Sequence, residues 1–318
     1  MRVLVTGGAG FIGSHQCDAL LAQGHRVFAW DNLITGKTEN VEHLLSTEDF
    51  SFSKLDVTEP LPTIAIDAVF HLASPASPVG YSHYPIETLM VNSVGTRNVL
   101  ELARNSKAKF LLASTSEAYG DPLIHPQTET YWGNVNPVGP RCMYDEGKRF
   151  AEALSINYAW THDLDVRIIR IFNTFGPRND PKDGRIIPNI ITQVLLGETI
   201  TVYGDGQQTR SFCYVSDLVE GILAAMFSDN TTAEVFNLGN PEEHTALEMA
   251  ELIKSLAASD SPIMHTPPRQ EEIARRQPDI AKAKAVLKWE PRISLSEGLT
   301  RTVAWFRQRL DEGPHENR

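Results

Sequence analysis

The chain has 318 residues, of which 42% are hydrophobic, and a formal net charge of −11. This composition is ordinary for a globular protein, and the length predicts two domains or one large α/β unit. The negative charge disfavours a general binder of nucleic acid or of anionic membranes, because both functions need a positive field.

Short apolar, β-branched segments alternate with helical patterns through the first half of the chain. Strands are expected at residues 2–6, 26–30, 50–55, 68–72, 109–113 and 166–172, and helices at 11–23, 85–105 and 144–162. This alternation predicts βαβ units and a mostly parallel sheet. Several strand segments are apolar on both faces, which is typical of strands covered by helices on both sides.

Beyond residue 175 the pattern becomes less regular and richer in glycine and proline. Helices interrupted by short strands are expected over residues 187–196, 200–203, 217–227, 235–238 and 246–257, followed by two short helices at 280–287 and 296–310. We therefore expect an α/β protein with a doubly wound parallel sheet in residues 1–175, to which later parts of the chain can return. A smaller C-terminal substrate domain is expected in residues 176–310, and a polar tail in 311–318.

The first expected strand ends in a glycine-rich turn with the sequence TGGAGFIG at residues 6–13. These glycine spacings occur where a strand runs into a helix that binds a dinucleotide. Without side chains, the backbone can turn tightly and lie close to a pyrophosphate, which the N-terminus of the following helix stabilises. The sheet is therefore expected to be a Rossmann-type dinucleotide-binding domain.

An acidic residue, Asp31, closes the second expected strand. Its carboxylate can accept a hydrogen bond from the 2′-hydroxyl of a ribose and would repel a 2′-phosphate, which predicts NAD rather than NADP as the cofactor. A solvated acid at the end of a strand is the alternative interpretation. After the third strand, Asp56 and Val57 are candidate contacts to the adenine.

Tyr144 and Lys148 are four residues apart in an expected helix, so they share one face of it. An ammonium beside a phenol favours the phenolate, which predicts a lowered pKa for Tyr144 and a base for a sugar hydroxyl. Thr115, at the end of the fifth strand, is a candidate partner for the same substrate oxygen. A surface pair is the alternative for this spacing alone, but the nucleotide loop upstream favours the catalytic interpretation.

Seven motifs together resemble a known family. They are TGGAGFIGSH at 6–15, HLAS at 71–74, STSEAYGDP at 114–122, NPVGPRCMYDEGKR at 136–149, RIFNTFGPR at 170–178, YGDGQQTRSFCYVSDL at 203–218 and RRQPDIAKAK at 275–284. Over nearly the whole chain, the sequence is similar to the extended short-chain dehydrogenase/reductase family. Within it, Thr-Ser-Glu at 115–117 and Arg-x-Pro-Asp at 276–279 resemble the UDP-glucuronate decarboxylase branch.

The resemblance implies a role for each matching position. The catalytic residues would be Thr115, Glu117, Tyr144, Lys148 and Arg276. The NAD-binding residues would be Gly7, Gly10, Phe11, Ile12, Gly13, Asp31, Asn32, Asp56, Val57, Leu72, Ala73 and Ser74, with Tyr144 and Lys148. The residues that bind the nucleotide sugar would be Ser116, Asn173, Arg185, Tyr203, Gln208 and Arg210. No metal site is expected.

The implied reaction is NAD-dependent oxidation at the sugar 4-position, loss of the carboxylate as CO₂, and reduction of the ketone to give UDP-xylose. Glu117 and Arg276 would direct the decarboxylation, and a structural ion pair between them is the alternative. A 4-epimerase or 4,6-dehydratase of the same family remains an alternative, as does a non-catalytic NAD-sensing relative. The choice between UDP and dTDP stays open.

We expect a small-molecule substrate and no nucleic acid or membrane partner. No apolar run reaches the roughly 18 residues that a membrane span requires. Three widely spaced cysteines argue against a disulfide framework and favour a reducing compartment, so a cytoplasmic protein is expected. The resemblance also suggests a homodimer formed through the helices at 85–105 and 144–162.

Overall fold

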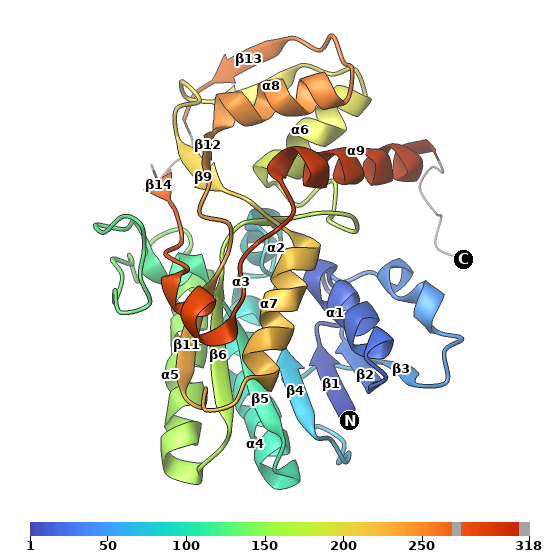
Figure 1. Cartoon of the computed structure of the whole chain (residues 1–318), viewed down its shortest axis with the longest axis vertical. Coiled ribbons are helices and arrows are strands. Elements are labelled where there is room, and N and C mark those ends of the chain that lie inside the picture. Colours follow the sequence, from blue (N-terminus) through green and yellow to red (C-terminus); the bar gives the residue numbers. More distant parts are fainter. Residues whose placement is uncertain (269–274, 312–318) are drawn as a thin grey trace.

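The computed structural model describes residues 1–268 and 275–311, and a seven-stranded parallel sheet lies at its centre (Figure 1). In spatial order the strands are β11 (Glu234–Leu238), β6 (Val166–Ile171), β5 (Lys109–Thr115), β4 (Ala68–His71), β1 (Arg2–Thr6), β2 (Arg26–Asp31) and β3 (Phe50–Lys54). Every neighbouring pair runs parallel. The order steps outward from β1 in both directions, so the expected doubly wound, Rossmann-type α/β fold is confirmed.

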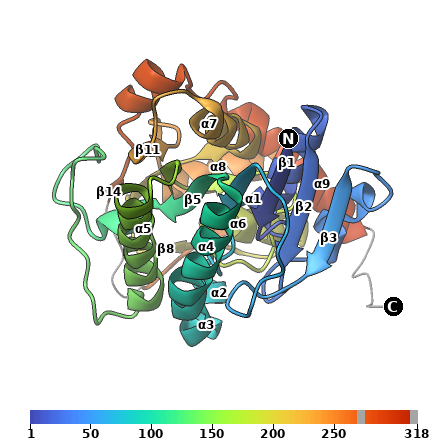
Figure 2. The same cartoon turned by 90° about the horizontal axis from the view of Figure 1, so that it is seen from below.

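Helices cover both faces of the sheet (Figure 2). Side chains alternate between the faces along each strand. Val3 and Val5 on β1 therefore share a core with α1 (Phe11–Ala22) and α7 (Val215–Phe227). Leu4, between them, belongs to the core under α4 (Thr96–Ser106) and α5 (Cys142–His162). All three side chains are fully buried, which explains why these strands are apolar on both faces.

The long helix expected at 85–105 is present but contains one irregular turn. α3 (Pro85–Met90) leads into the π-helical turn η3 (Val91–Gly95), and α4 continues from it. A π turn of this kind often lies at a functional site. Here it places Asn92 so that its amide donates to the Ser74 hydroxyl, 2.9 Å away, at the rim of the cavity described below.

A smaller layer lies beyond the carboxyl ends of the central strands, in the upper part of Figure 1. Its helices are α6 (Ile186–Leu195), α8 (Ala246–Leu256) and α9 (Leu295–Asp311). Its strands form two small sheets, β12 (Glu243–Thr245) with β9 (Thr209–Ser211) and β14 (Arg275–Arg276), and β8 (Ile200–Tyr203) with β13 (Ile263–Thr266). The pair β7 (Thr174–Phe175) and β10 (Cys213–Tyr214) connects the two layers.

The chain crosses between the layers more than once. After β10 it returns to the large sheet through α7 and β11, and it then goes back to the smaller layer at β12. Residues 176–310 therefore contribute to both layers, and the cavity lies between parts of the chain that are distant in sequence. The expected tail lies outside the described residues except for Asp311, which ends α9. Within the described ranges, no helix is long and apolar enough to cross a membrane.

Candidate active site

A cavity of about 1020 Å³ opens at the carboxyl ends of β1, β4, β5 and β6 and is closed above by the smaller layer. In a doubly wound sheet this edge is where ligands bind. Most of the expected site residues line it, namely Gly7, Gly10, Phe11, Ile12, Gly13, Leu72, Ser74, Thr115, Ser116, Glu117, Tyr144, Lys148, Asn173, Arg185, Tyr203, Gln208, Arg210 and Arg276. The expected residues that do not line it are Asp31, Asn32, Asp56, Val57 and Ala73.

The glycine-rich turn around Gly7, Gly10 and Gly13, here called the glycine cradle, packs too closely against neighbouring backbone to admit side chains. Gly7 has a φ of +71°, and a Cβ there would come within 2.9 Å of the Leu72 and Ala73 backbone. At Gly13 a Cβ would collide with the carbonyl oxygen of Gly7. Gly10 caps α1 without a side-chain hydrogen bond, and the first turn of that helix carries no acid. The helix N-terminus therefore presents free N–H groups and a positive dipole end to a pyrophosphate.

Asp31 holds this turn from behind. Its carboxylate accepts hydrogen bonds from the Ala9 N–H, at 3.1 Å, and from the Leu33 N–H, at 2.8 Å. Burial raises the pKa of Asp31, and the two backbone hydrogen bonds oppose that rise. Asn32 in turn donates to Asp56, 2.8 Å away. The acid at the end of β2 is therefore nearly buried and structurally engaged, unlike the solvated acid that was the alternative interpretation.

The tyrosine, lysine and threonine meet at one point of the cavity wall. Tyr144 and Lys148 lie on the first two turns of α5, and both are buried. The Lys148 ammonium nitrogen is 6.0 Å from the centroid of the Tyr144 ring and donates to the Ala113 carbonyl at 2.9 Å. Thr115, at the end of β5, hydrogen-bonds the Tyr144 side chain. The three side chains are thus brought together, with the Thr115 hydroxyl next to the Tyr144 phenol and Lys148 beside its ring.

The prediction that the pKa of Tyr144 is lowered is wrong for the protein without ligand. Burial raises the pKa of Tyr144, and the hydrogen bond with Thr115 only opposes this rise. Burial also lowers the pKa of Lys148 to about 7, so the lysine is a weaker source of positive charge than its type suggests. The helical spacing did not reveal how deeply both groups are buried, and burial disfavours the charged form of each.

Glu117 joins the two layers through arginines. Its carboxylate accepts two hydrogen bonds from Arg276 on β14, at 2.5 and 2.8 Å, and also pairs with Arg141 at the start of α5. Arg276 is 3% exposed, and burial lowers its pKa to about 10. The sequence motifs are thus brought together as expected, and the geometry is also that of the structural ion pair kept as the alternative.

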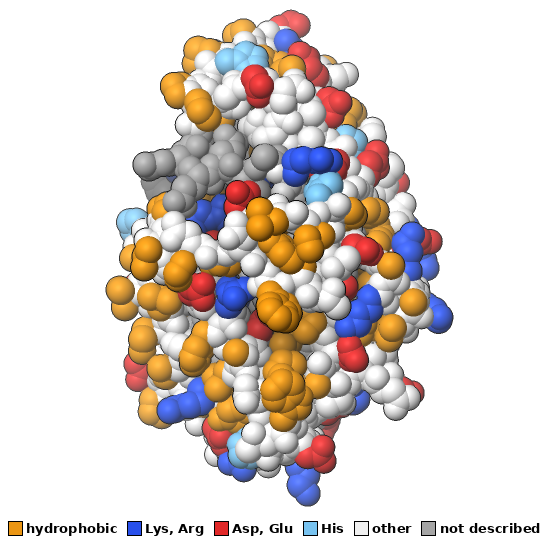
Figure 3. All heavy atoms as spheres, turned by 90° about the vertical axis from the view of Figure 1, so that its left-hand side faces the viewer, with side chains coloured by type: hydrophobic (Ala, Val, Ile, Leu, Met, Phe, Trp, Pro, Cys, Tyr) orange, Lys and Arg blue, Asp and Glu red, His pale blue; other side chains and the backbone are white. Residues whose placement is uncertain are grey.

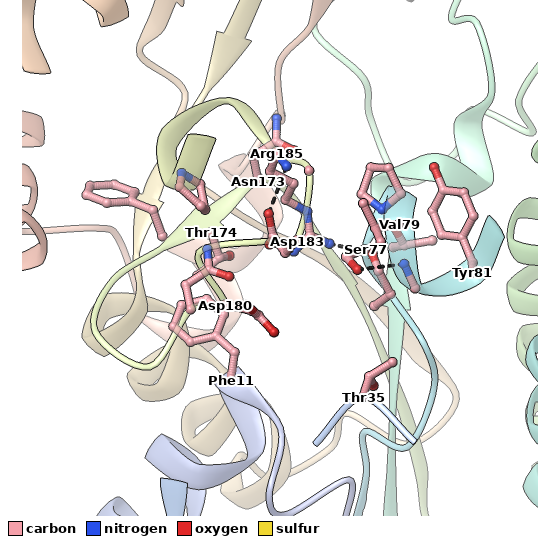
Figure 4. Close-up of a pocket in the computed structure, with 18 of the residues that line it drawn as sticks. Phe11, Thr35, Ser77, Val79, Tyr81, Asn173, Thr174, Asp180, Asp183 and Arg185 are labelled. Carbon is pink, nitrogen blue, oxygen red and sulfur yellow. Dashed lines mark hydrogen bonds and ion pairs between the residues drawn. The ribbon is translucent and has the colours of Figure 1, made fainter. Parts of the chain in front are cut away.

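Two loops meet over the middle of the cavity, as Figure 4 shows. Arg185 donates from its backbone N–H to Asp183, at 2.8 Å, and its guanidinium contacts both Asp183 and the Ala76 carbonyl. Gly184, with a φ of +81°, packs against Val79, where a Cβ would come within 2.7 Å. The segment after β4 is therefore fixed against the segment that precedes α6.

This contact adds lining residues that the sequence analysis missed. Tyr81, on α2 (Pro78–His83), stacks on Tyr144 with ring centroids 5.1 Å apart and an interplanar angle of 15°. Ser77 caps α2 by accepting from the Gly80 N–H at 3.0 Å. The Ser-Pro pair at 77–78 is a helix-start signal that could have indicated α2. Asp183 carries no such local signal.

Two ion pairs connect the nucleotide-binding half of the molecule to the segment after β7. Lys37, in the loop after β2, pairs with Asp180 at 2.9 Å, and Arg178 pairs with Asp18 on α1 at 2.6 Å. The His15 ring lies 2.9 Å from the Pro177 carbonyl between them. These contacts tie the nucleotide-binding half to the segment after β7.

On the smaller layer, the expected substrate residues lie close together. The Gln208 amide donates to the Tyr203 carbonyl at 3.0 Å, and Arg210 on β9 is next to Arg276 in the register of β9 and β14. Arg210 and Arg276 both line the cavity and bring positive charge there to a protein of net charge −11. Among the described residues no cluster of His, Cys, Asp and Glu could hold a metal ion.

Sequence comparison places the chain in a family. A sequence model of the NAD dependent epimerase/dehydratase family matches residues 3–239. The chain belongs to this family. It is 54% identical over 310 residues to UDP-glucuronic acid decarboxylase 1 of Danio rerio, covering 98% of this chain and 73% of that protein. It is 52% identical over 316 residues to UDP-glucuronic acid decarboxylase 1 of Arabidopsis thaliana, covering 98% and 72%.

Solved structures of the epimerase/dehydratase family have the same fold. UDP-glucose 4-epimerase from Thermotoga maritima, solved with UDP-glucose, superposes with a TM-score of 0.88 at 33% identity, covering 98% of this chain and 100% of that one. UDP-glucuronic acid 4-epimerase from Bacillus cereus, solved with UDP-glucuronic acid and NAD, gives 0.87 at 30% identity, covering 97% and 99%. The cofactor of this chain is NAD, and Gly7, Gly10 and Gly13, which would hold its pyrophosphate, line the cavity.

Proposed function

We propose that this member of the family is a UDP-glucuronate decarboxylase that releases CO₂ and UDP-xylose. One observation carries the proposal. The chain is about half identical, over 98% of its length, to proteins named UDP-glucuronic acid decarboxylases, whereas the solved epimerases are near 30%. The cavity supports it, because arginines gather near Tyr144, as an anionic sugar requires.

The first step is removal of the proton from the sugar 4-hydroxyl. Tyr144 is the base, and Thr115 shares the same oxygen and keeps the phenol oriented toward it. Lys148, when protonated, favours the phenolate by its charge. NAD, held by the glycine cradle, would supply the acceptor for the hydride of sugar carbon 4 and its donor in the last step, with no net change in the cofactor. The glycine cradle and Asp31 orient the dinucleotide for this exchange.

The second step separates a decarboxylase from an epimerase. Oxidation gives a 4-keto acid, whose carboxylate departs readily because the ketone accepts the electron pair as an enolate. We assign this step to Glu117 and the arginine Arg276 that is paired with it. Glu117 repels the substrate carboxylate, which disfavours that charged ground state relative to neutral CO₂, while Arg276, hydrogen-bonded to Glu117, stabilises the enolate oxygen or helps to deliver the following proton.

Assembly and location belong to the same proposal. Large apolar side chains are exposed on α3 and α5, among them Ile86, Met90, Phe150 and Trp160. Figure 3 looks at the side of the molecule on which α5 lies in Figure 1 and shows hydrophobic side chains gathered there. We propose that a second copy of the chain covers them. The three cysteines are free, which supports a cytoplasmic location.

The second candidate is a UDP-glucuronic acid 4-epimerase, which the fold match to such an enzyme favours. Incubation of the purified protein with UDP-glucuronic acid separates the two by mass. Loss of CO₂ from the sugar nucleotide is expected, and a product of unchanged mass with altered retention would indicate an epimerase. The dTDP-linked sugar, tested in parallel, reports on the base. No conversion of either would overturn the proposal.

A further inference from the structure

A buried ion pair lies directly behind the lysine of the site. Glu152 follows Lys148 by one turn of α5, so the two side chains share a helix face. The Glu152 carboxylate accepts two hydrogen bonds from Arg170 on β6, at 2.9 and 2.7 Å. It accepts a third from the Ser114 hydroxyl on β5, at 2.5 Å. Glu152 is only 9% exposed, so its charge acts in a poorly screened environment.

Two adjacent residues of β5 hydrogen-bond to Glu152 and Lys148. Ser114 binds Glu152, and the preceding residue, Ala113, accepts the hydrogen bond from the Lys148 ammonium at 2.9 Å. Arg170 is fixed in turn, because its guanidinium lies 4.7 Å from the centroid of the Tyr119 ring. Glu152 therefore cannot swing away from the lysine without breaking three hydrogen bonds.

We propose that Glu152, held by Arg170 and Ser114, is a positioning residue that keeps the buried Lys148 protonated and directed along β5 toward Tyr144. The inference rests on the proposed function only in that it gives Lys148 a catalytic role. An ammonium in an apolar site needs a compensating charge, and Glu152 supplies it from the same helix. Arg170 and Ser114 engage the Glu152 carboxylate, while Lys148 donates to the Ala113 carbonyl.

Other charged or titratable groups face this region from each neighbouring element. His71 on β4 is buried, and its pKa is lowered to about 3, first by burial and then by Lys148, so it stays neutral. Arg170 on β6 adds a positive charge, and Tyr119, whose pKa is raised to about 12 by burial, stays neutral. Tyr144 on α5, whose pKa burial raises, stays protonated in the absence of substrate. Asp145, three residues before Lys148 on α5, is also buried but pairs with Arg141 at 3.8 Å, and Glu152 is the carboxylate whose charge opposes the fall in the pKa of Lys148.

The sign of the effect follows from these charges. Burial lowers the pKa of Lys148 to about 7, and the charge of Glu152 opposes that fall. Removing the charge lowers the pKa of Lys148 further, and the unpaired Arg170 acts in the same direction. The lysine then loses its proton at a lower pH, and the substrate oxidation that depends on it declines at a lower pH as well.

Glu152→Gln tests this directly, because it keeps the shape of the side chain and removes its charge. The titration of Lys148 is followed by NMR in protein labelled with ¹⁵N at the lysine ammonium, and Lys148→Arg assigns the resonance. We expect the midpoint of Lys148 to fall by at least about half a pH unit in Glu152→Gln. The alkaline limb of the pH profile for oxidation should move in the same direction.

Two further variants keep the test independent of folding. Glu146→Gln removes a carboxylate from the exposed side of the same helix, where Glu146 pairs with Arg149 at 3.7 Å, and should leave the midpoint unchanged. The double variant Glu152→Gln with Arg170→Met removes both charges and should recover part of the shift, which loss of packing would not do. An unchanged midpoint in Glu152→Gln would overturn the inference. The titration needs no substrate, so it stands whichever sugar nucleotide the protein converts.

Discussion

Burial raises the pKa of the Tyr144 phenol, whereas the hydrogen bond with Thr115 lowers it. The effect of burial is the larger one, so Tyr144 depends on neighbouring groups to become a base. Tyr81 stacks on the ring and Thr115 contacts the oxygen, so the hydroxyl has a single direction in which to act. Packing against Tyr81 orients the base, and the charge of Lys148 activates it. Each contribution can be removed by a separate substitution.

Tyr144→Phe should lower turnover by roughly 100-fold or more, because it removes the general base without changing the ring. The protein should keep its NAD, since the glycine cradle is untouched. The comparison variant is Tyr158→Phe on the same helix, whose hydroxyl donates to Glu101 at 2.6 Å outside the cavity. Turnover is measured with UDP-glucuronic acid and NAD content after unfolding. Near-normal turnover would exclude Tyr144 as the base.

Glu117→Gln should separate oxidation from CO₂ release. The oxidation residues are untouched, so reduced cofactor should still form on mixing with UDP-glucuronic acid. The loss of charge at Glu117 should slow CO₂ release, and the 4-keto acid should accumulate. Rapid-mixing absorbance follows the first event and trapped ¹⁴C-labelled CO₂ the second. Glu101→Gln, which breaks a surface pair with Arg104, is the control. Equal loss of both rates, or unfolding, would leave Glu117 with only its structural pairing to Arg276.

At the scale of helices and strands, the sequence predicted those features that a few adjacent residues determine. The turn between β1 and α1 and the Tyr144–Lys148 spacing on α5 could be recognised because a few adjacent residues encode each of them. The stacking of Tyr81 and the contact of Arg185 with the Ala76 carbonyl could not. They arise where loops from distant parts of the chain pack together. The raised pKa of Tyr144 was missed for the same reason, since burial depends on the whole fold.

A further prediction concerns Asp31, at the end of β2. Asp31→Ala leaves the Ala9 and Leu33 N–H groups without their acceptor, which should cost about 1–3 kcal/mol of the free energy of unfolding. NAD should bind more weakly, and the preference for NAD over NADP should relax. Calorimetry measures both affinities and thermal unfolding the stability. Asp67→Ala, which removes a surface partner of Arg2, should change neither affinity. Wild-type protein that binds NADP as well as NAD would contradict this role.

At the scale of the whole molecule, the cavity exists only because the chain crosses between layers. The large sheet supplies the cradle and the base, and the smaller layer supplies Arg210 and Arg276. Glu117 and Arg276 connect the layers inside the cavity, while α7 and β11 connect them through the core. The parallel sheet followed from the alternating pattern, but the return of β11 to the edge beside β6 has no signal in its own five residues.

The proposed dimer makes a prediction at this scale. Phe150 and Trp160 on α5 are 51% and 73% exposed, and glutamates at both positions would place charge in the proposed interface. We expect the wild type to sediment as a dimer and the double variant Phe150→Glu with Trp160→Glu to sediment as a monomer. Leu45→Glu, at a residue 51% exposed outside α3 and α5, should leave the dimer intact. A wild type that sediments as a monomer, or a double variant that stays dimeric, would refute this surface.

The ion pairs Lys37–Asp180 and Arg178–Asp18 have a consequence for metabolism. They tie the glycine-cradle side of the molecule to the segment after β7, and we expect this connection to favour retention of the cofactor between turnovers. The proposed reaction returns NAD to its starting state before the product departs, and no exchange with free nicotinamide is needed between turnovers. Flux through such an enzyme is insulated from the redox balance of the cell. It follows the supply of sugar nucleotide, and the enzyme behaves as a lyase although every turnover passes through an oxidation.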